Sequence, residues 1–312
     1  MSFTYEVKNE VSKLEVPKTE NIAELSALLI STAEISDTIK ITIENASVAR
    51  KIFSSIKEIF DINVKITVRK GFNFQKKYLY ILEITKKIPD ILETLGIANG
   101  ITSSYIYDDD ETLRAYLRGM FLGCGSINDP KKSRYHLEFL LNNITLANEL
   151  NKLLNKKNLG SKVLKRENRY MVYIKGSEKI SDFLRIISAS NALLYYEDIR
   201  IYRDHKNMVN RLNNCELSNQ TKTIQTGLKQ LNEINYIIDN DLLSLLDDNT
   251  KIICEIRKKY PESSLAEIAQ IANVEYGYNI GKSGVNHHFI KIAALVKRHK
   301  DSVVNNEKKN NI

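Results

Sequence analysis

The sequence predicts an α+β fold in two parts: a duplicated body with pseudo-two-fold symmetry and an all-α C-terminal domain. The first observation is an internal repeat, because the order helix, strand, helix, two strands, helix occurs twice at a spacing of about 92 residues, measured from Leu25 to Leu117. Such a period is typical of two fused halves rather than of a solenoid. The second observation is that only helical patterns follow residue 242.

The first half of the body, expected over residues 20–100, follows an amphipathic helix at 1–14. That leading helix places Phe3, Val7 and Val11 on one face among charged residues, unlike the unbroken apolar core of a signal peptide. Apolar periodicity then predicts a helix at 22–31, a strand at 39–43, a helix at 46–60, strands at 63–69 and 78–84, and a helix at 89–95.

The second half, expected over residues 111–200, repeats this order after an acidic loop at 108–111. Its predicted elements are a helix at 113–124, a strand at 135–140, a helix at 144–157, strands at 162–166 and 170–175, and a helix at 178–187. The complete body is expected over residues 1–217.

Composition argues against a disulfide framework, a thiolate zinc site and a membrane span. The chain has 312 residues, and no apolar run approaches the roughly 18 residues that cross a membrane. Its three cysteines lie far apart without a Cys-x-x-Cys pair, at Cys124, Cys215 and Cys254. We therefore expect a cytoplasmic protein with no cofactor, no metal ion and no membrane partner.

The helices that open the two halves share a pattern of small residues four positions apart. Ala27 and Ser31 in the first helix match Gly119 and Gly123 in the second. Small residues on one helical face allow two backbones to approach closely. We therefore expect these two helices to pack against each other as the axis of the body, with Gly125 ending the second.

The same helices with their flanks, 23–35 and 113–130, resemble the paired helices of the LAGLIDADG homing endonucleases. The resemblance implies a fold in which each helix ends in a carboxylate, and the two carboxylates hold divalent metals for phosphodiester hydrolysis. Thr32 and Cys124 stand at the matching positions, and neither replaces a carboxylate as a magnesium ligand. The nearest acids lie past the helix ends, at Glu34 and Asp129. We expect a LAGLIDADG-like body without catalytic residues, and an active metal-dependent endonuclease is the alternative.

Beyond the body we expect a linker at 218–241, a helical domain at 242–304 and a disordered tail at 305–312. Ser264 and Glu267 have the spacing of a capping box, which opens the middle helix. The three predicted helices of the domain are 250–259, 265–272 and 284–297. This arrangement predicts a helix-turn-helix domain, although the connection at 273–282 is longer than the usual turn.

The last of these helices has the pattern of a DNA recognition helix, and we expect Ser283 to cap it. One face is apolar, through Val285, Phe289, Ile292 and Val296. Between Lys282 and Lys300 the chain has five Lys and Arg residues and no acid, as contact with phosphates requires. The residues predicted to contact DNA are Lys282, Ser283, Asn286, His287 and Lys291.

The net charge of +8 is concentrated in one segment of the body. Residues 151–211 contain 14 Lys and Arg against 6 Asp and Glu, and the rest of the chain is balanced. A localised excess of this kind attracts polyanions, although a solvated face explains it equally well. The DNA-contacting residues predicted in this segment are Lys165, Arg166, Arg169 and Lys175.

Four stretches, in order and at compatible spacing, resemble the WhiA family of bacterial DNA-binding regulators. They are MSFTYEVKNEV, LRGMFLGCGSINDP, IYRDHKNMVNRLNNCELSNQTKT, and SLAEIAQ followed by IGKSGVNHHFIKI. The resemblance implies a catalytically inactive LAGLIDADG-like domain joined to a helix-turn-helix domain. It also implies a transcriptional regulator connected with cell division, chromosome segregation or sporulation.

We therefore predict a non-enzymatic regulator that binds double-stranded DNA in a sequence-specific way and associates with the nucleoid. The alternative is a protein-interaction module whose C-terminal domain contacts RNA polymerase or another transcription regulator. The salt dependence of binding to naked DNA separates these two interpretations.

Overall fold

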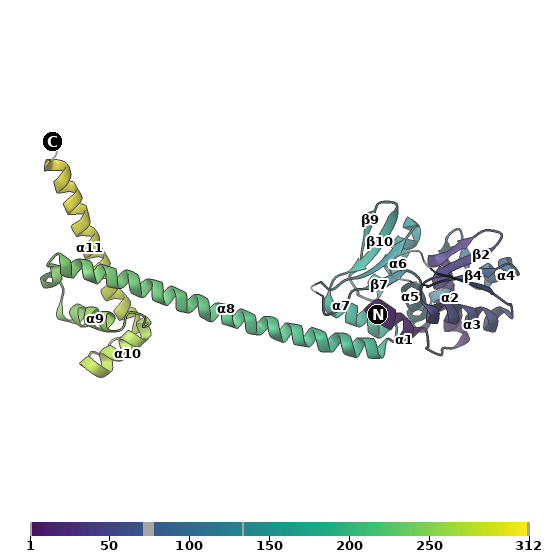
Figure 1. Cartoon of the computed structure of the whole chain (residues 1–312), viewed down its shortest axis with the longest axis horizontal. Helices are drawn as coiled ribbons and strands as arrows, with labels where there is room; N and C mark the ends of the chain where they lie inside the picture. The colour runs from purple at the N-terminus through teal and green to yellow at the C-terminus, as the bar shows by residue number, and fades with distance from the viewer. Residues whose placement is uncertain (1, 71–77, 133, 311–312) are drawn as a thin grey trace. The chain divides into compact units, whose positions relative to one another are not determined.

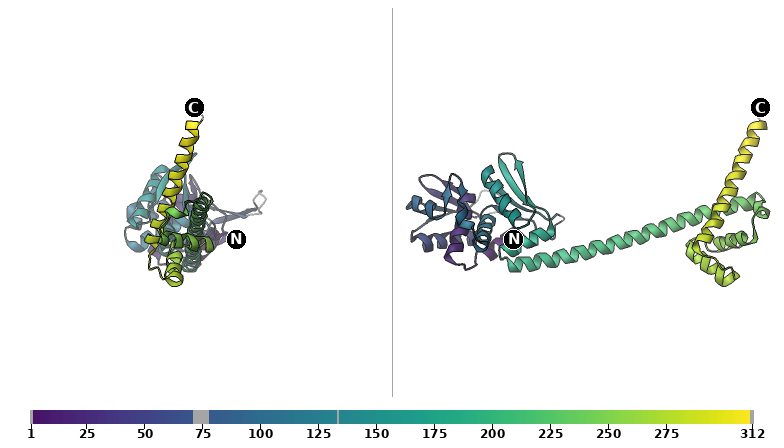
Figure 2. Two further views of the ribbon diagram at one scale, coloured as in Figure 1. Left: turned by 90° about the vertical axis from the view of Figure 1, so that its left-hand side faces the viewer. Right: turned by 180° about the vertical axis from the view of Figure 1, so that it is seen from behind.

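The structure is a computed structural model that describes residues 2–70, 78–132 and 134–310, with side chains up to residue 303 (Figure 1). It divides into two compact units, Met1–Asp204 and His205–Ile312. Helix α8 (Ser190–Asp239) crosses this division as one uninterrupted helix (Figure 2). The predicted linker at 218–241 therefore lies almost wholly within α8.

The first unit contains the duplicated body. Its first half consists of α1 (Phe3–Val11), α2 (Lys18–Thr32), β1 (Ala33–Ile35), β2 (Ile39–Ile43), α3 (Ala46–Phe60), β3 (Lys65–Lys70), β4 (Tyr78–Ile84) and α4 (Ile88–Thr94). A connection follows, with β5 (Ile97–Ala98), β6 (Ile101–Thr102) and the 3₁₀ turn η1 (Ser104–Tyr107). The second half consists of α5 (Asp110–Cys124), β7 (Gly125–Ile127), β8 (Leu137–Leu141), α6 (Ile144–Lys156), β9 (Lys162–Arg166), β10 (Arg169–Ile174) and α7 (Ser177–Ile186).

The two halves have the same sheet topology, which confirms the predicted duplication. The strand order is β1-β2-β4-β3 in one sheet and β7-β8-β10-β9 in the other, and every pairing is antiparallel. Each sheet buries one face, since Ile39, Ile41 and Ile43 of β2 are buried while the residues between them are exposed. The sequence did not reveal β1 and β7, which are three-residue strands directly after α2 and α5.

The prediction of an acidic loop at 108–111 was wrong in part, because α5 begins at Asp110 and not at residue 113. Asp109 is the N-cap and accepts hydrogen bonds from the backbone N–H groups of Glu111 and Thr112. Asp110 and Glu111 lie in the first turn of α5, where carboxylates interact favourably with the helix dipole.

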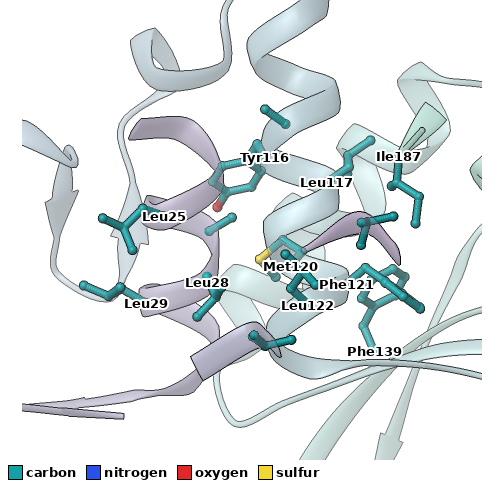
Figure 3. Packing of buried hydrophobic residues seen from close by; sticks show 14 of the residues in the cluster. Leu25, Leu28, Leu29, Tyr116, Leu117, Met120, Phe121, Leu122, Phe139 and Ile187 are labelled. Carbon is teal, nitrogen blue, oxygen red and sulfur yellow. The ribbon is translucent and has the colours of Figure 1, made fainter. Parts of the chain in front are cut away.

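Helices α2 and α5 pack closely along the axis of the body, as the small residues predicted (Figure 3). A Cβ atom added to Gly119 would lie 2.2 Å from the carbonyl oxygen of Glu24, and one added to Gly123 would lie 2.2 Å from Ser31 Oγ. Only glycine therefore allows this approach. Apolar side chains from both helices fill the surrounding core, including Leu25, Leu28, Leu29, Tyr116, Met120 and Phe121.

A buried ion pair also joins the two axial helices. The Arg118 guanidinium donates from Nε to the Glu24 carboxylate at 2.6 Å, and Nη2 lies 3.5 Å from Glu20. Arg118 and Glu24 are both buried, so each requires the other as a partner. The pair fixes the register of α2 against α5.

The second unit contains the end of α8, the 3₁₀ turn η2 (Leu242–Leu245), and helices α9 (Asp248–Lys259), α10 (Leu265–Tyr276) and α11 (Lys282–Asn310). Ser264 and Glu267 form the predicted capping box at the start of α10. Ile234 and Ile237 of α8 pack into the same core as the three helices. Helix α11 continues to Asn310, into the range 305–312 where the sequence predicted a disordered tail.

The connection between α10 and α11 is shorter than predicted, because α10 continues past Ala272 to Tyr276. Gly277 then ends the helix in the left-handed conformation, with φ at 64° and its N–H bonded to the Ala272 carbonyl. The chain from Gly277 to Gly281 forms the turn. This compact connection is closer to that of a helix-turn-helix than the sequence pattern indicated.

Candidate nucleic-acid interface

The ends of α2 and α5, where a LAGLIDADG endonuclease would hold its metal ions, carry no carboxylate. Thr32 Oγ1 donates to the carbonyl of Leu28 at 2.6 Å, and Cys124 Sγ donates to the carbonyl of Met120 at 3.3 Å. Burial raises the pKa of the Cys124 thiol to about 12, so it stays a neutral thiol. The two side chains are satisfied by their own helices.

The acids nearest in sequence do not replace these missing ligands. Glu34 lies in β1 on an exposed position, and the Asp129 carboxylate accepts a hydrogen bond from the backbone of Lys131. Among the described residues, no group of three or more His, Cys, Asp or Glu side chains could hold a metal ion. The side chains at the ends of α2 and α5 are therefore held by packing and by hydrogen bonds within their own helices.

The basic hairpin of the second half places its predicted residues on two different faces. Arg166 pairs directly with Arg169 across β9 and β10, and side chains that are directly opposite lie on the same face. Lys165 pairs with Tyr170 and therefore points to the other face, which α6 covers further along the sheet. The structure thus brings Arg166 and Arg169 together and separates Lys165 from them.

Lys175 follows β10, two positions after Tyr173, on the face of Arg166 and Arg169. Its ammonium lies 4.9 Å from the centre of the Tyr173 ring. All four predicted hairpin residues are exposed, and none of them forms an ion pair within the described part of the chain. Their charges are available to an anionic partner.

The last helix presents an apolar face and a polar face, as the sequence predicted. Val285, Phe289, Ile292 and Val296 are buried in the core of the second unit. The predicted DNA-contacting residues of α11 are exposed: Lys282, Ser283, Asn286, His287 and Lys291. This places them together on the solvent side of one helix.

The expectation that Ser283 caps α11 was wrong. The helix begins at Lys282, one position earlier, and the N–H of Val285 bonds to the carbonyl of Gly281. Ser283 therefore lies in the first turn of the helix, and Gly281 occupies the capping position. In the first turn, the Ser283 hydroxyl and a free backbone N–H stay available to a phosphate.

A network of hydrogen bonds that the sequence did not reveal connects α11 to the start of α9. His288 is buried, with Nδ1 at 2.7 Å from Thr250 Oγ1 and Nε2 at 3.0 Å from Tyr278 Oη. Thr250 Oγ1 also donates to Asp247 Oδ1, and the other Asp247 oxygen lies 3.5 Å from Lys291 Nζ. The N-cap of α9 thus contacts a predicted DNA-contacting lysine.

Electrostatics within this network favour an ionised Asp247 and a neutral His288. Burial alone would raise the pKa of the Asp247 carboxyl, but hydrogen bonds from Thr250 and the nearby Lys291 lower it. Burial lowers the pKa of His288, and the neighbouring Lys291 and His287 lower it further, against the attraction of Asp247. The sequence contains a signal for the cap, since Asp247 stands three residues before Thr250 at the start of a helix. It contains no signal for the contact with Lys291, which joins two different helices.

Buried Arg257 also positions the helix-turn-helix, a role that no pattern in the sequence indicated. Its guanidinium donates to the carbonyls of Pro261 and Ser263 at 3.2 Å and 2.6 Å, and lies 5.3 Å from the centre of the Phe289 ring. Arg257 therefore holds the turn after α9 against α11. This contact fixes the helix that carries the exposed polar face.

Family models match nearly the whole chain. The WhiA N-terminal LAGLIDADG-like domain matches residues 18–98, the WhiA LAGLIDADG-like domain matches 113–206, and the WhiA C-terminal HTH domain matches 209–296. The chain is 40% identical over 320 residues to a "Probable cell division protein WhiA" of Clostridium botulinum, covering 97% of this chain and 100% of that protein. It is also 40% identical over 308 residues to the protein of that name in Staphylococcus aureus, covering 96% and 97%.

Solved structures have the same fold. The crystal structure of full-length DUF199/WhiA from Thermatoga maritima matches with a TM-score of 0.58 and 23% identity, covering 96% of this chain and 99% of that one. In the described part of the chain, no helix combines the length and the apolar character needed to cross a membrane.

Proposed function

Since the chain belongs to the WhiA family, we propose that it is a non-enzymatic regulator that binds specific double-stranded DNA sites on the nucleoid. Its relatives are named as probable cell division proteins, and we extend that process to this chain. The observation that carries the proposal is the exposed face of α11, on a helix whose residues 282–300 contain five Lys and Arg and no acid. Such a face suits the phosphate-lined major groove.

We assign different roles to the two groups of predicted residues. On α11, Asn286 pairs with adenine, His287 and Lys291 contact base edges, and Lys282 and Ser283 contact phosphates. On the body, Arg166, Arg169 and Lys175, which share one face of the hairpin, contact phosphates without reading sequence. Because α8 tethers the two units, weak binding by each raises the effective concentration of the other on the same DNA.

In vitro site selection with the wild type and with Asn286→Ala, His287→Ala and Lys291→Ala tests the reading role. Each good base contact contributes on the order of 1 to 3 kcal/mol of discrimination, so each variant should lose preference at one position of the selected site. Lys297→Ala removes an exposed charge further along the same helix and serves as the matched control. Circular dichroism checks folding. If all three variants select the wild-type site, α11 does not read the sequence, and contact with the transcription machinery becomes the better interpretation.

We further propose that the body does not cleave DNA, a conclusion supported by Thr32 and Cys124 at the helix ends. Incubation of the purified protein with DNA and magnesium or manganese should leave supercoiled plasmid intact. Metal-dependent cutting that disappears on Glu34→Gln or Asp129→Asn substitution would show an endonuclease instead.

A further inference from the structure

A pocket of about 880 Å³ lies in the first unit between α1, the end of β2, the start of β4 and the end of α5. It adjoins the end of the axial helices, since Gly123 forms part of its wall. Three tyrosine rings line it, from Tyr5, Tyr78 and Tyr80. The volume is within the range of small-molecule sites, roughly 300–1,000 Å³.

Lys8 supplies an unpaired cation to this pocket. Its ammonium lies 5.7 Å from the centre of the Phe121 ring, and within the described chain it makes no hydrogen bond or ion pair. Burial lowers the pKa of Lys8 to about 8, against the attraction of the Glu44 carboxylate at the end of β2. An anion that entered the pocket would stabilise the charged form of Lys8.

Asn45 supplies a donor without an acceptor. It is 5% exposed and caps α3, with Oδ1 accepting from the N–H groups of Ser47 at 2.9 Å and Val48 at 3.1 Å. Its Nδ2 is buried and has no partner among the described residues. Because Oδ1 is held by the helix, Nδ2 is the only group of this amide left to donate, and Asn45 forms part of the pocket wall.

We propose that this pocket binds the phosphate group of a small phosphorylated molecule of about nucleotide size. Lys8 and Asn45 donate to the phosphate oxygens, and the N-terminus of the 15-residue helix α3 adds its dipole. The tyrosine rings pack against the remaining, planar part of the ligand. The Glu44 carboxylate on the same wall offsets part of this positive field.

Isothermal titration calorimetry on the full chain tests the proposal with AMP, inorganic phosphate and adenosine as probes. AMP should bind at one site, inorganic phosphate more weakly, and adenosine, which lacks the phosphate, should not bind. The affinity for AMP should fall as the pH rises above about 8, because Lys8 loses its charge there.

Two variants identify the residues responsible. Lys8→Met removes the ammonium at similar length, and Asn45→Asp keeps the capping oxygen but replaces the donor with a negative charge. Each should lower AMP affinity on the order of tenfold or more, since a charge-assisted hydrogen bond is lost. Lys13→Met, an exposed lysine just after α1, is the matched control and should change nothing. Thermal melting checks that each variant folds.

Three results would overturn the proposal. The first is that neither the wild type nor Lys13→Met shows saturable AMP binding. The second is that Lys8→Met binds AMP as tightly as the wild type, and the third is that Lys13→Met weakens AMP binding as much as Lys8→Met does. A competition with a short DNA duplex separates the two sources of phosphate. If the duplex displaces AMP, the site belongs to the DNA backbone, and the small-molecule assignment is wrong. Because the pocket shares no residue with α11, failure here leaves the site-selection result unaffected.

Discussion

Replacing Asp247 by Asn tests how the start of α9 controls the charge that α11 offers to DNA. One Asp247 oxygen lies 3.5 Å from Lys291 Nζ, and the other accepts hydrogen bonds from Thr250 as the N-cap. Asn is an equally good capping residue, so the substitution keeps the cap and removes only the negative charge. Lys291 then loses its intramolecular partner.

The cost to stability should be small. Two unit charges at 3.5 Å attract by about 1.2 kcal/mol in water, but the side chains of Lys291 and Asp247 are 48% and 52% exposed, so solvent screening leaves a net contribution of roughly 0 to 1 kcal/mol. The effect on DNA binding should be larger, because a carboxylate that repels the nearby phosphates disappears and the Lys291 charge no longer has Asp247 as its partner. We expect the slope of log K against log salt to become steeper by about 0.9.

Fluorescence anisotropy of a labelled duplex, measured between roughly 50 and 200 mM salt, gives this slope. Asp248→Asn is the matched control, because it makes the same charge change at the next residue, where the carboxylate is 94% exposed and pairs with Lys251 of its own helix. Equal slopes in Asp247→Asn and Asp248→Asn would show that net charge alone matters, and would refute the role of the Asp247 to Lys291 pair.

Three further predictions follow from the same geometry. Arg166→Ala should flatten the salt slope of DNA binding by about 0.9, whereas Lys165→Ala, on the other face of the hairpin, should leave it nearly unchanged. Gly119→Ala should lower the free energy of unfolding, measured in urea, by roughly 1–3 kcal/mol or more, because the added methyl group overpacks against the Glu24 carbonyl. Gly176→Ala should be tolerated, because the nearest atoms to its added Cβ belong to Lys179 and lie at 3.3 Å or more. Because burial lowers the pKa of His288, the unfolded state takes up its proton first as pH falls, so the second unit should lose stability below about pH 6.5, and His288→Gln should flatten this dependence.

The elements that the sequence predicted best are those whose signal is local. The helix α3 was predicted with its observed bounds, because its apolar spacing is regular and Asn45 provides a cap beside it. The strands β1 and β7 were missed, since three residues carry no visible alternation. They are defined by pairing with distant residues, as in Ala33 with Ile41 and Gly125 with Phe139.

In the candidate interface, too, local patterns predicted some features and could not predict others. Exposure of Asn286, His287 and Lys291 follows from the helical period, so the sequence predicted it. The pairing of Lys291 with Asp247 joins residues from different helices, and no local pattern encodes it. The predicted end of α10 at Ala272 is too early for another reason: residues 273–276 are exposed and add nothing to the apolar period, and the helix ends only at Gly277.

The axis of the body shows how packing and catalysis can separate within one motif. Close approach of α2 and α5 depends on the missing Cβ atoms of Gly119 and Gly123, and hydrolysis in the endonucleases depends on carboxylates at the helix ends. These are different atoms, so replacing the carboxylates leaves the packing intact. Here Lys8 of α1 lines the same pocket as Gly123, the neighbour of Cys124, and its ammonium lies 5.7 Å from the centre of the Phe121 ring. A divalent ion in this place would meet electrostatic repulsion as well as a lack of carboxylate ligands, which is why we propose that the body binds anions and does not cleave DNA.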